Sequence, residues 1–92
     1  ERSSVERSMA RQIRSLLAQA IREGWADEEA RPSLRDGHPV IPVNPSYKRN
    51  IPGIVHDESS SGKTVFIEPI EIVESNNRMR ELDAAAGRLF VF

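Results

Sequence analysis

Apolar side chains recur at intervals of three and four residues along the first part of the chain. That spacing places them on one face of an α-helix. The helix is predicted to run to about Glu23, where Gly24 ends or kinks it, and at about 1.5 Å per residue it would be about 30 Å long. Its apolar face consists of Val5, Met9, Ile13, Leu16, Leu17, Ala20 and Ile21.

The pattern then changes to short runs of β-branched and apolar residues separated by turn residues. Asp36-Gly37 is a strong signal for a two-residue hairpin turn, which would place Arg35 opposite His38. Pro39 and Pro42 in the following run favour an edge strand, because proline has no N–H to donate to a neighbouring strand.

A second hairpin is predicted over Gly53 to Pro69, with a loop at Ser59 to Gly62. This loop would place Glu58 opposite Lys63 and form an ion pair at the mouth of the hairpin. The residues before it, Asn44 to Pro52, read as a loop.

Helical spacing returns from Pro69 to about Ala86, where proline suits the first turn of a helix. The apolar seam of this helix is narrow, as in a helix that packs on one partner. Its positions are Ile72, Ser75, Met79, Leu82 and Ala86.

These elements predict an α+β fold in which two roughly antiparallel helices form an arm that carries a small antiparallel β tip of two hairpins. The expected parts are a lever helix (1–31), a clamp-like β insertion (32–68), a returning lever helix (69–86) and a tail (87–92). The apolar tail has no partner in the pattern, and an expression vector or a truncated reading frame would explain it.

Composition limits the function classes. The chain has 92 residues, is 38% hydrophobic and carries 13 Lys and Arg against 14 Asp and Glu, so any attraction to nucleic acid must be local. It has no cysteine, which excludes disulfides and thiolate metal sites and suits a reducing cytosol. No run of about 20 apolar residues indicates a membrane span. We expect a soluble, cytoplasmic protein without a membrane partner.

The stretch DESSSGKT invites comparison with a phosphate-binding P-loop. Asp57 stands where that loop needs a glycine, and Thr64 leads into β-branched and aromatic residues and not into a helix. We therefore predict neither a nucleotide site nor a catalytic site in this chain. His38 and His56 have no carboxylate at a spacing that builds a metal site, so we expect no metal and interpret both as surface or packed residues.

Four cations are candidates for phosphate contacts. Lys48-Arg49 is the adjacent basic pair that follows Tyr47, and Arg35 and Lys63 stand at the mouths of the two predicted hairpins. A solvated loop is the competing interpretation of the Lys48-Arg49 segment. Ile72, Met79 and Leu82 are the candidates for an interface along the helix seam.

Three segments together resemble one protein family. LRDGHPVIPV, YKRNIPGIVHDESSSGKTVFIEP and EIVESNNRMRELD are similar, over about residues 33–83, to the core of the second bacterial branch of MutS proteins, the MutS-two (MutS2) family. The sequence departs from the family pattern at His38, where arginine is usual, and again after Asp83.

The resemblance implies the lever and clamp-like part of a dimeric MutS-like protein that closes on nucleic-acid backbone. It implies a cytoplasmic parent that is a DNA-binding ATPase, uses ATP and magnesium and carries an Smr-type endonuclease domain. It also implies roles in DNA repair, in suppressing recombination and, in some lineages, in ribosome rescue. The ATPase and nuclease motifs are not in these residues, so the chain itself is expected to be neither enzyme.

The leading hypothesis is a non-catalytic module that contacts the backbone of duplex or branched DNA, or of ribosomal RNA. The alternative is a module for homodimerisation or ribosome interaction, which the near-zero net charge favours slightly. A free-standing ATP-binding enzyme is the third hypothesis, and it requires nucleotide binding through Lys63.

Overall fold

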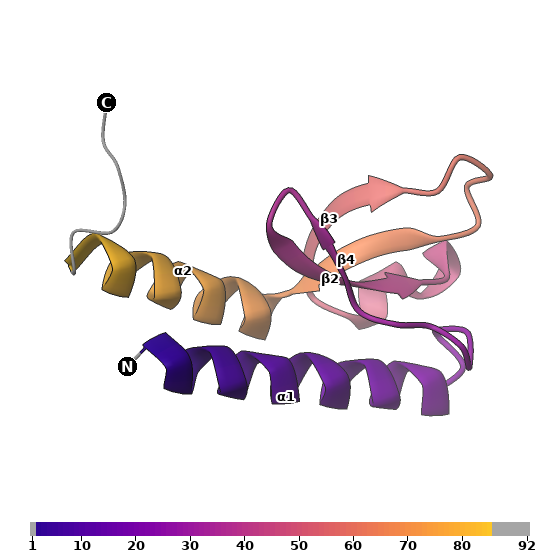
Figure 1. The fold of residues 1–92 in the computed structure, drawn as a ribbon. Coiled ribbons are helices and arrows are strands. Elements are labelled where there is room, and N and C mark those ends of the chain that lie inside the picture. Colours follow the sequence, from indigo (N-terminus) through magenta and orange to yellow (C-terminus); the bar gives the residue numbers. More distant parts are fainter. Residues whose placement is uncertain (1, 86–92) are drawn as a thin grey trace.

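The computed structural model describes residues 2–85 as two helices and a four-stranded antiparallel sheet (Figure 1). The predicted α+β class is therefore confirmed. Residues 87–92, predicted as a tail, lie outside the described residues. In chain order the elements are α1 (Arg2–Arg22), β1 (Ser33–Arg35), β2 (His38–Val43), the 3₁₀-helix η1 (Pro45–Asn50), β3 (Gly53–Glu58), β4 (Val65–Pro69) and α2 (Ile70–Ala85).

Helix α1 forms where the apolar spacing predicts it. Ile13, Leu17 and Ala20 on its apolar face are buried. The helix ends at Arg22 and is capped at Gly24, whose φ of +80° only glycine adopts readily. The amide of Trp25 donates to the carbonyl of Ala20 (2.8 Å) and that of Gly24 to Ile21 (3.1 Å), the hydrogen-bond pair of a Schellman cap.

The sheet has the strand order β1-β2-β4-β3, so β2 joins the two hairpins. The expectation that the proline-containing run is an edge strand is wrong in this respect. β1 pairs with the first half of β2, and β4 pairs only with Ile41–Val43. Because each half of β2 is paired on one side only, Pro39 and Pro42 are tolerated in a strand that is central in the order.

The first predicted hairpin is confirmed. Arg35 lies opposite His38, and the turn residues Asp36 and Gly37 have φ values of 52° and 81°. Two successive positive φ values are the signature of a type I′ turn, whose twist matches that of the flanking strands.

The second hairpin forms, but its predicted register is wrong. Glu58 lies opposite Val65, not opposite Lys63, and the connection spans residues 59–64. Ser59 closes that loop by exchanging hydrogen bonds with Thr64. A β-bulge between Val55 and Asp57 inserts one more residue into β3, and neither the longer loop nor the bulge is visible in the apolar pattern.

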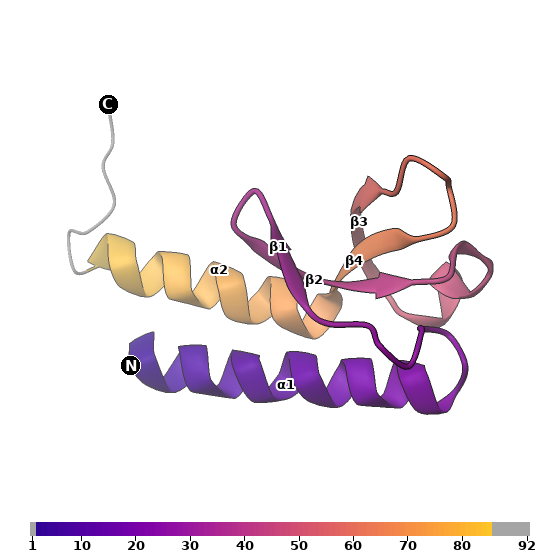
Figure 2. The ribbon, with the colours of Figure 1, turned by 45° about the vertical axis from the view of Figure 1, so that its right-hand side comes forward.

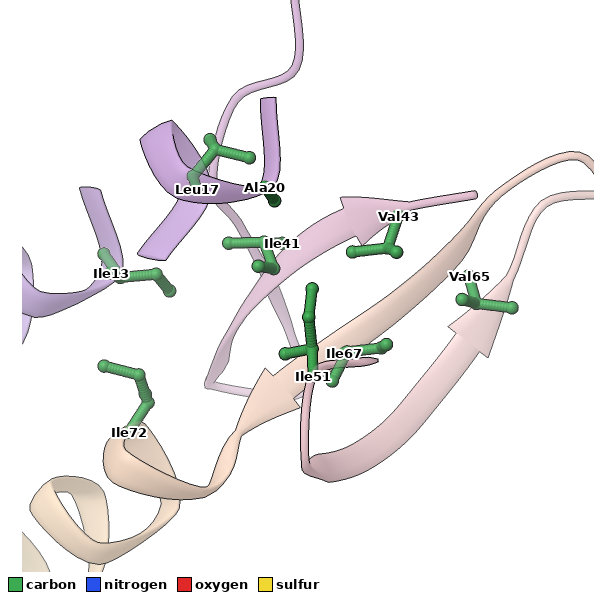
Figure 3. Close-up of a cluster of buried hydrophobic side chains, with 9 residues drawn as sticks. All are labelled: Ile13, Leu17, Ala20, Ile41, Val43, Ile51, Val65, Ile67 and Ile72. Atoms are coloured by element: carbon green, nitrogen blue, oxygen red, sulfur yellow. The ribbon is translucent and has the colours of Figure 1, made fainter. Parts of the chain in front are cut away.

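The core lies between α1 and the face of the sheet that covers it (Figure 3). Strands β2 and β4 contribute alternate residues to this face, as a half-buried sheet requires. The side chain of Ile51, just after η1, joins this core beside Ile67 (Figure 3). The core residues are Ile13, Leu17, Ala20, Ile41, Val43, Ile51, Val65, Ile67 and Ile72.

Helix α2 runs back antiparallel to α1 and lies beside its N-terminal half, while the sheet lies beside the C-terminal half (Figures 1 and 2). The hydroxyl of Ser75 donates to Oε1 of Gln12 across the two helices (3.1 Å). Ile72, predicted as an interface residue, is 0% exposed and belongs to the core of this chain. Ile72 is therefore not available to contact another molecule, as the interface hypothesis required. Met79 and Leu82, the other two residues of that hypothesis, are half-buried. Among residues 2–85, neither helix combines the length and apolar character needed to cross a bilayer.

Gly53 provides a test of the β3–β4 packing. A Cβ at this position would clash with the carbonyl oxygen of Glu68 and lie 2.9 Å from Cα of Pro69. Because both obstacles are backbone, Gly53→Ala is expected to lower the free energy of unfolding by roughly 1–3 kcal/mol in urea denaturation. Ser60→Ala, in an exposed loop, is the control. An unchanged midpoint for Gly53→Ala would contradict the close approach of the two strands.

Candidate functional site

Lys48 and Arg49 lie in the last turn of η1, and both are exposed. This segment, predicted as a loop, is a 3₁₀-helix because Asn44 caps it. The side-chain oxygen of Asn44 accepts from the amide of Ser46 (2.9 Å), and proline follows at the first helical position. The buried side chain of Ile51 anchors the other end. The two cations are therefore held on a fixed turn.

Lys63 is exposed in the loop of residues 59–64 that joins β3 to β4. The amide of Gly62 donates to the carbonyl of Ser59 (2.9 Å), and that of Thr64 to the hydroxyl of Ser59 (3.1 Å). These amides are used within the loop, and Thr64 leads into a strand. A phosphate-binding P-loop needs outward amides and a following helix, so this loop has the geometry of a strand connection.

An open hollow of about 620 Å³ lies beside this loop. Its lining includes Lys63 and Thr64, and also Asn44 at the end of β2. Asp27 also lines it, so the local charge is mixed. We call η1 together with residues 59–64 the sheet end of the molecule; it lies at the opposite end from the C-terminal part of α2 (Figure 2).

Arg35, the fourth candidate cation, is engaged within the chain. Its Nε donates to Oδ2 of Asp57 (3.1 Å), and its guanidinium lies 4.1 Å from the ring centroid of Phe66. It also donates to the hydroxyl of Ser33 and the carbonyl of Leu34. A guanidinium committed to these partners is less able to contact a phosphate than Lys48, Arg49 or Lys63.

The structure brings together three residues that the sequence analysis left apart. Oε1 of Glu68 lies 2.6 Å from Nε2 of His56 and 3.1 Å from Nδ1 of His38. The two imidazole rings stack with centroids 4.5 Å apart and an interplanar angle of 17°. The β-bulge accounts for part of this arrangement: it lets His56 contact Glu68 while the next residue, Asp57, turns to Arg35.

Glu68 is the buried charged residue of this cluster, with 1% exposure. Its second carboxylate oxygen, Oε2, is buried without a hydrogen-bond partner. The side-chain amide of Asn76, on α2, lies 3.4 Å from Nδ1 of His38. The expectation that no carboxylate accompanies the histidines rested on sequence spacing, which does not report the pairing of distant strands. A glutamate between Ile67 and Pro69 in an apolar strand was the available signal for a buried partner.

The chain is similar in sequence to known proteins. No protein-family model matches the chain. A protein of Thermomicrobium roseum named Endonuclease MutS2 is 47% identical over 76 residues, which are 83% of this chain and 9% of that protein. One of Alkaliphilus oremlandii with the same name is 35% identical over 80 residues, 87% of this chain and 10% of that protein. One of Finegoldia magna, also so named, is 58% identical over 52 residues, 56% of this chain and 7% of that protein.

The chain belongs to the MutS2 family. The resemblance inferred from the three sequence segments is thereby confirmed. The chain spans about a tenth or less of the length of the curated MutS2 relatives named above. The fold and the clusters described here are therefore those of one MutS2 segment.

The engagement of Arg35 in this MutS2 segment predicts a measurable coupling with Asp57. Both side chains are partly exposed, so a double-mutant cycle with Arg35→Ala and Asp57→Ala should give a coupling of about 0.5 kcal/mol in urea denaturation. The control cycle pairs Arg35→Ala with Glu58→Ala, whose residue lies opposite Val65. Equal coupling in the two cycles would show that Arg35 is not held by Asp57.

Proposed function

We propose that this segment is a non-catalytic clamp and lever part of a MutS2 protein that contacts the phosphate backbone of nucleic acid. The contacts are made by Lys48 and Arg49, with Lys63 as an additional point charge. Arg35 stays with Asp57 and takes no direct part. Backbone contacts of this kind position a protein on a double helix without reading its sequence.

The observation that carries this proposal is the fixed turn of η1. It presents two adjacent exposed cations between a capped start at Asn44 and a buried residue, Ile51. Because this turn is already ordered, its two cations lose less conformational entropy on binding than they would on a flexible loop. Because the net charge is −1, the surface as a whole does not attract a polyanion, so binding depends on a local group of cations such as this one.

The rest of the proposal concerns the whole protein. The relatives are named endonucleases, and their matched segments are 7–10% of their length. We assign endonuclease activity, together with the ATP- and magnesium-dependent ATPase activity implied by the resemblance, to parts of the protein outside this chain. The segment would then transmit or restrain motion in a cytoplasmic dimer bound to DNA or to ribosomal RNA.

Lys48→Ala/Arg49→Ala tests the backbone contact. The double variant should bind duplex DNA roughly tenfold or more weakly at low salt. The slope of log K against log salt should fall in magnitude by about 1 for each lost phosphate contact. Fluorescence anisotropy with duplex DNA, four-way branched DNA and a structured RNA, at two salt concentrations, measures both effects and distinguishes the ligands.

The control for this experiment is Arg78→Ala/Arg80→Ala, which removes two exposed positive charges from α2, away from the sheet end. It matches the change in net charge without touching η1. If both double variants lose the same affinity, the attraction is a property of total charge and the assignment to η1 fails. Binding unchanged in Lys48→Ala/Arg49→Ala removes these residues from the proposal.

A second candidate function is homodimerisation through β3. In the described part of the chain β3 pairs only with β4, and its Ile54 and Val55 are 47% and 49% exposed. An edge strand with exposed apolar residues can pair with the same strand of a second copy about a two-fold axis. The alternative hypothesis allows pairing through either the β tip or the helix seam, and this observation favours the β tip.

Val55→Lys tests the dimer. If β3 mediates it, light scattering should show a concentration-dependent dimer for the unmodified chain and a monomer for Val55→Lys, because a charge opposes edge pairing. Leu34→Lys replaces an apolar residue on β1 that is still more exposed (64%) and serves as the matched control. A chain that stays monomeric at every concentration would exclude this candidate function for the segment alone.

A further inference from the structure

We propose that His38, His56 and Glu68 form a binding site for a divalent transition-metal ion of the zinc class. The inference is independent of the nucleic-acid role proposed above. It is drawn from the donor set, from a buried oxygen without a partner and from a conflict in hydrogen bonding at His38.

The donor atoms already converge. One possible ligand atom from each of His38, His56 and Glu68 lies within 4.8 Å of the other two. The ring nitrogens that contact Oε1 of Glu68 are Nδ1 of His38 and Nε2 of His56. Ligand atoms around a tetrahedral zinc ion are roughly 3.3 Å apart, given bonds of about 2.0–2.2 Å. The contacts of 2.6 Å and 3.1 Å to Oε1 are close to that spacing. To admit an ion, the carboxylate must rotate and at least one imidazole must leave the stacked arrangement, so that its in-plane lone pair points at the ion.

The chemistry of the donors selects the class of metal. Two imidazole nitrogens with one carboxylate oxygen suit zinc, copper, nickel or cobalt, whereas magnesium and calcium take oxygen ligands. Three protein ligands leave a coordination position for water or another ligand. The His38 and His56 side chains are 38% and 20% exposed, so an ion can enter from that side while Glu68 closes the inner side.

Glu68 supplies the second and independent observation. Its side chain is almost fully buried, and Oε2 has no hydrogen-bond partner. A buried carboxylate with an unpartnered oxygen is costly unless a positive charge compensates it. A divalent ion beside Oε1 places two positive charges there and can also be reached by Oε2 in a bidentate arrangement.

His38 supplies the third observation. Its Nδ1 faces both Oε1 of Glu68 and the amide of Asn76. If Nδ1 carries a proton, it donates to Glu68 and cannot accept from Asn76; if it does not, it can accept from Asn76 but cannot donate to Glu68. Coordination of an ion through the Nδ1 lone pair removes this conflict. The Asn76 amide, whose oxygen and nitrogen are interchangeable by rotation, can then turn its oxygen toward a metal-bound water.

Calorimetric titration of the 92-residue chain with Zn²⁺, after treatment with EDTA and desalting, tests the site. One ion per chain is expected. Glu68→Gln and His56→Ala should each weaken Zn²⁺ binding by more than about 100-fold. Loss of a residue that only hydrogen-bonds to a ligand costs about 100-fold at most. The control Asp57→Asn removes the next carboxylate on β3, which pairs with Arg35, and should leave the affinity unchanged.

Two measurements on the unmodified chain keep the test valid if a variant fails to fold. Co²⁺ in place of Zn²⁺ should give the visible absorption bands of a tetrahedral site, and ¹⁵N NMR should show metal at Nδ1 of His38 and at Nε2 of His56. Absence of Zn²⁺ uptake, attachment through the other ring nitrogens, or equal loss of affinity in Asp57→Asn and Glu68→Gln would overturn the proposal and leave a purely hydrogen-bonded cluster.

Discussion

Pairing between β2 and β4 joins two hairpins, neither of which would be stable alone. A single two-stranded hairpin buries too little apolar surface to fold in water. When Ile41 lies opposite Ile67, the two hairpins become one sheet whose inner face can cover α1. The apolar stripe of α1 then has two partners, the sheet along one half and α2 along the other (Figure 1). A change that separated β2 from β4 would expose the part of α1 that the sheet covers, together with the core.

The same pairing sets which side chains lie on the opposite face of β4. Because side chains alternate along β4, burying Ile67 against α1 turns Phe66 and Glu68 to the other side. Phe66 meets the guanidinium of Arg35, and Glu68 meets the two histidines. The bulge in β3 places the partners on consecutive residues: His56 contacts Glu68, and Asp57 contacts Arg35. Local irregularity in one strand thus positions two distinct side-chain clusters, as bulges commonly do near functional residues.

Local signals predicted the parts of the fold that depend on local interactions. The α1 stripe follows from helical spacing, and the first hairpin follows from Asp36-Gly37, because few residues tolerate two successive positive φ values. The register of the second hairpin could not be predicted, since it depends on the cap made by Ser59 and on the bulge. The His38–Glu68 contact was equally hidden, because it requires strands that are neighbours in the sheet but distant in sequence.

The two proposed sites differ in what the scaffold does for them. Lys48 and Arg49 need only an ordered, solvent-facing turn, because a phosphate is recognised largely through its charge and tolerates small displacements. The cluster at Glu68 needs donor atoms held to within a fraction of an ångström, which three strands of one sheet provide more precisely than a loop does. Since a bound ion would tie β2, β3 and β4 together, occupancy of that site should stiffen the sheet to which η1 is attached through Asn44 and Ile51. Coupling between the two sites, if both ligands bind, would then act through the rigidity of the sheet and not through a change of fold.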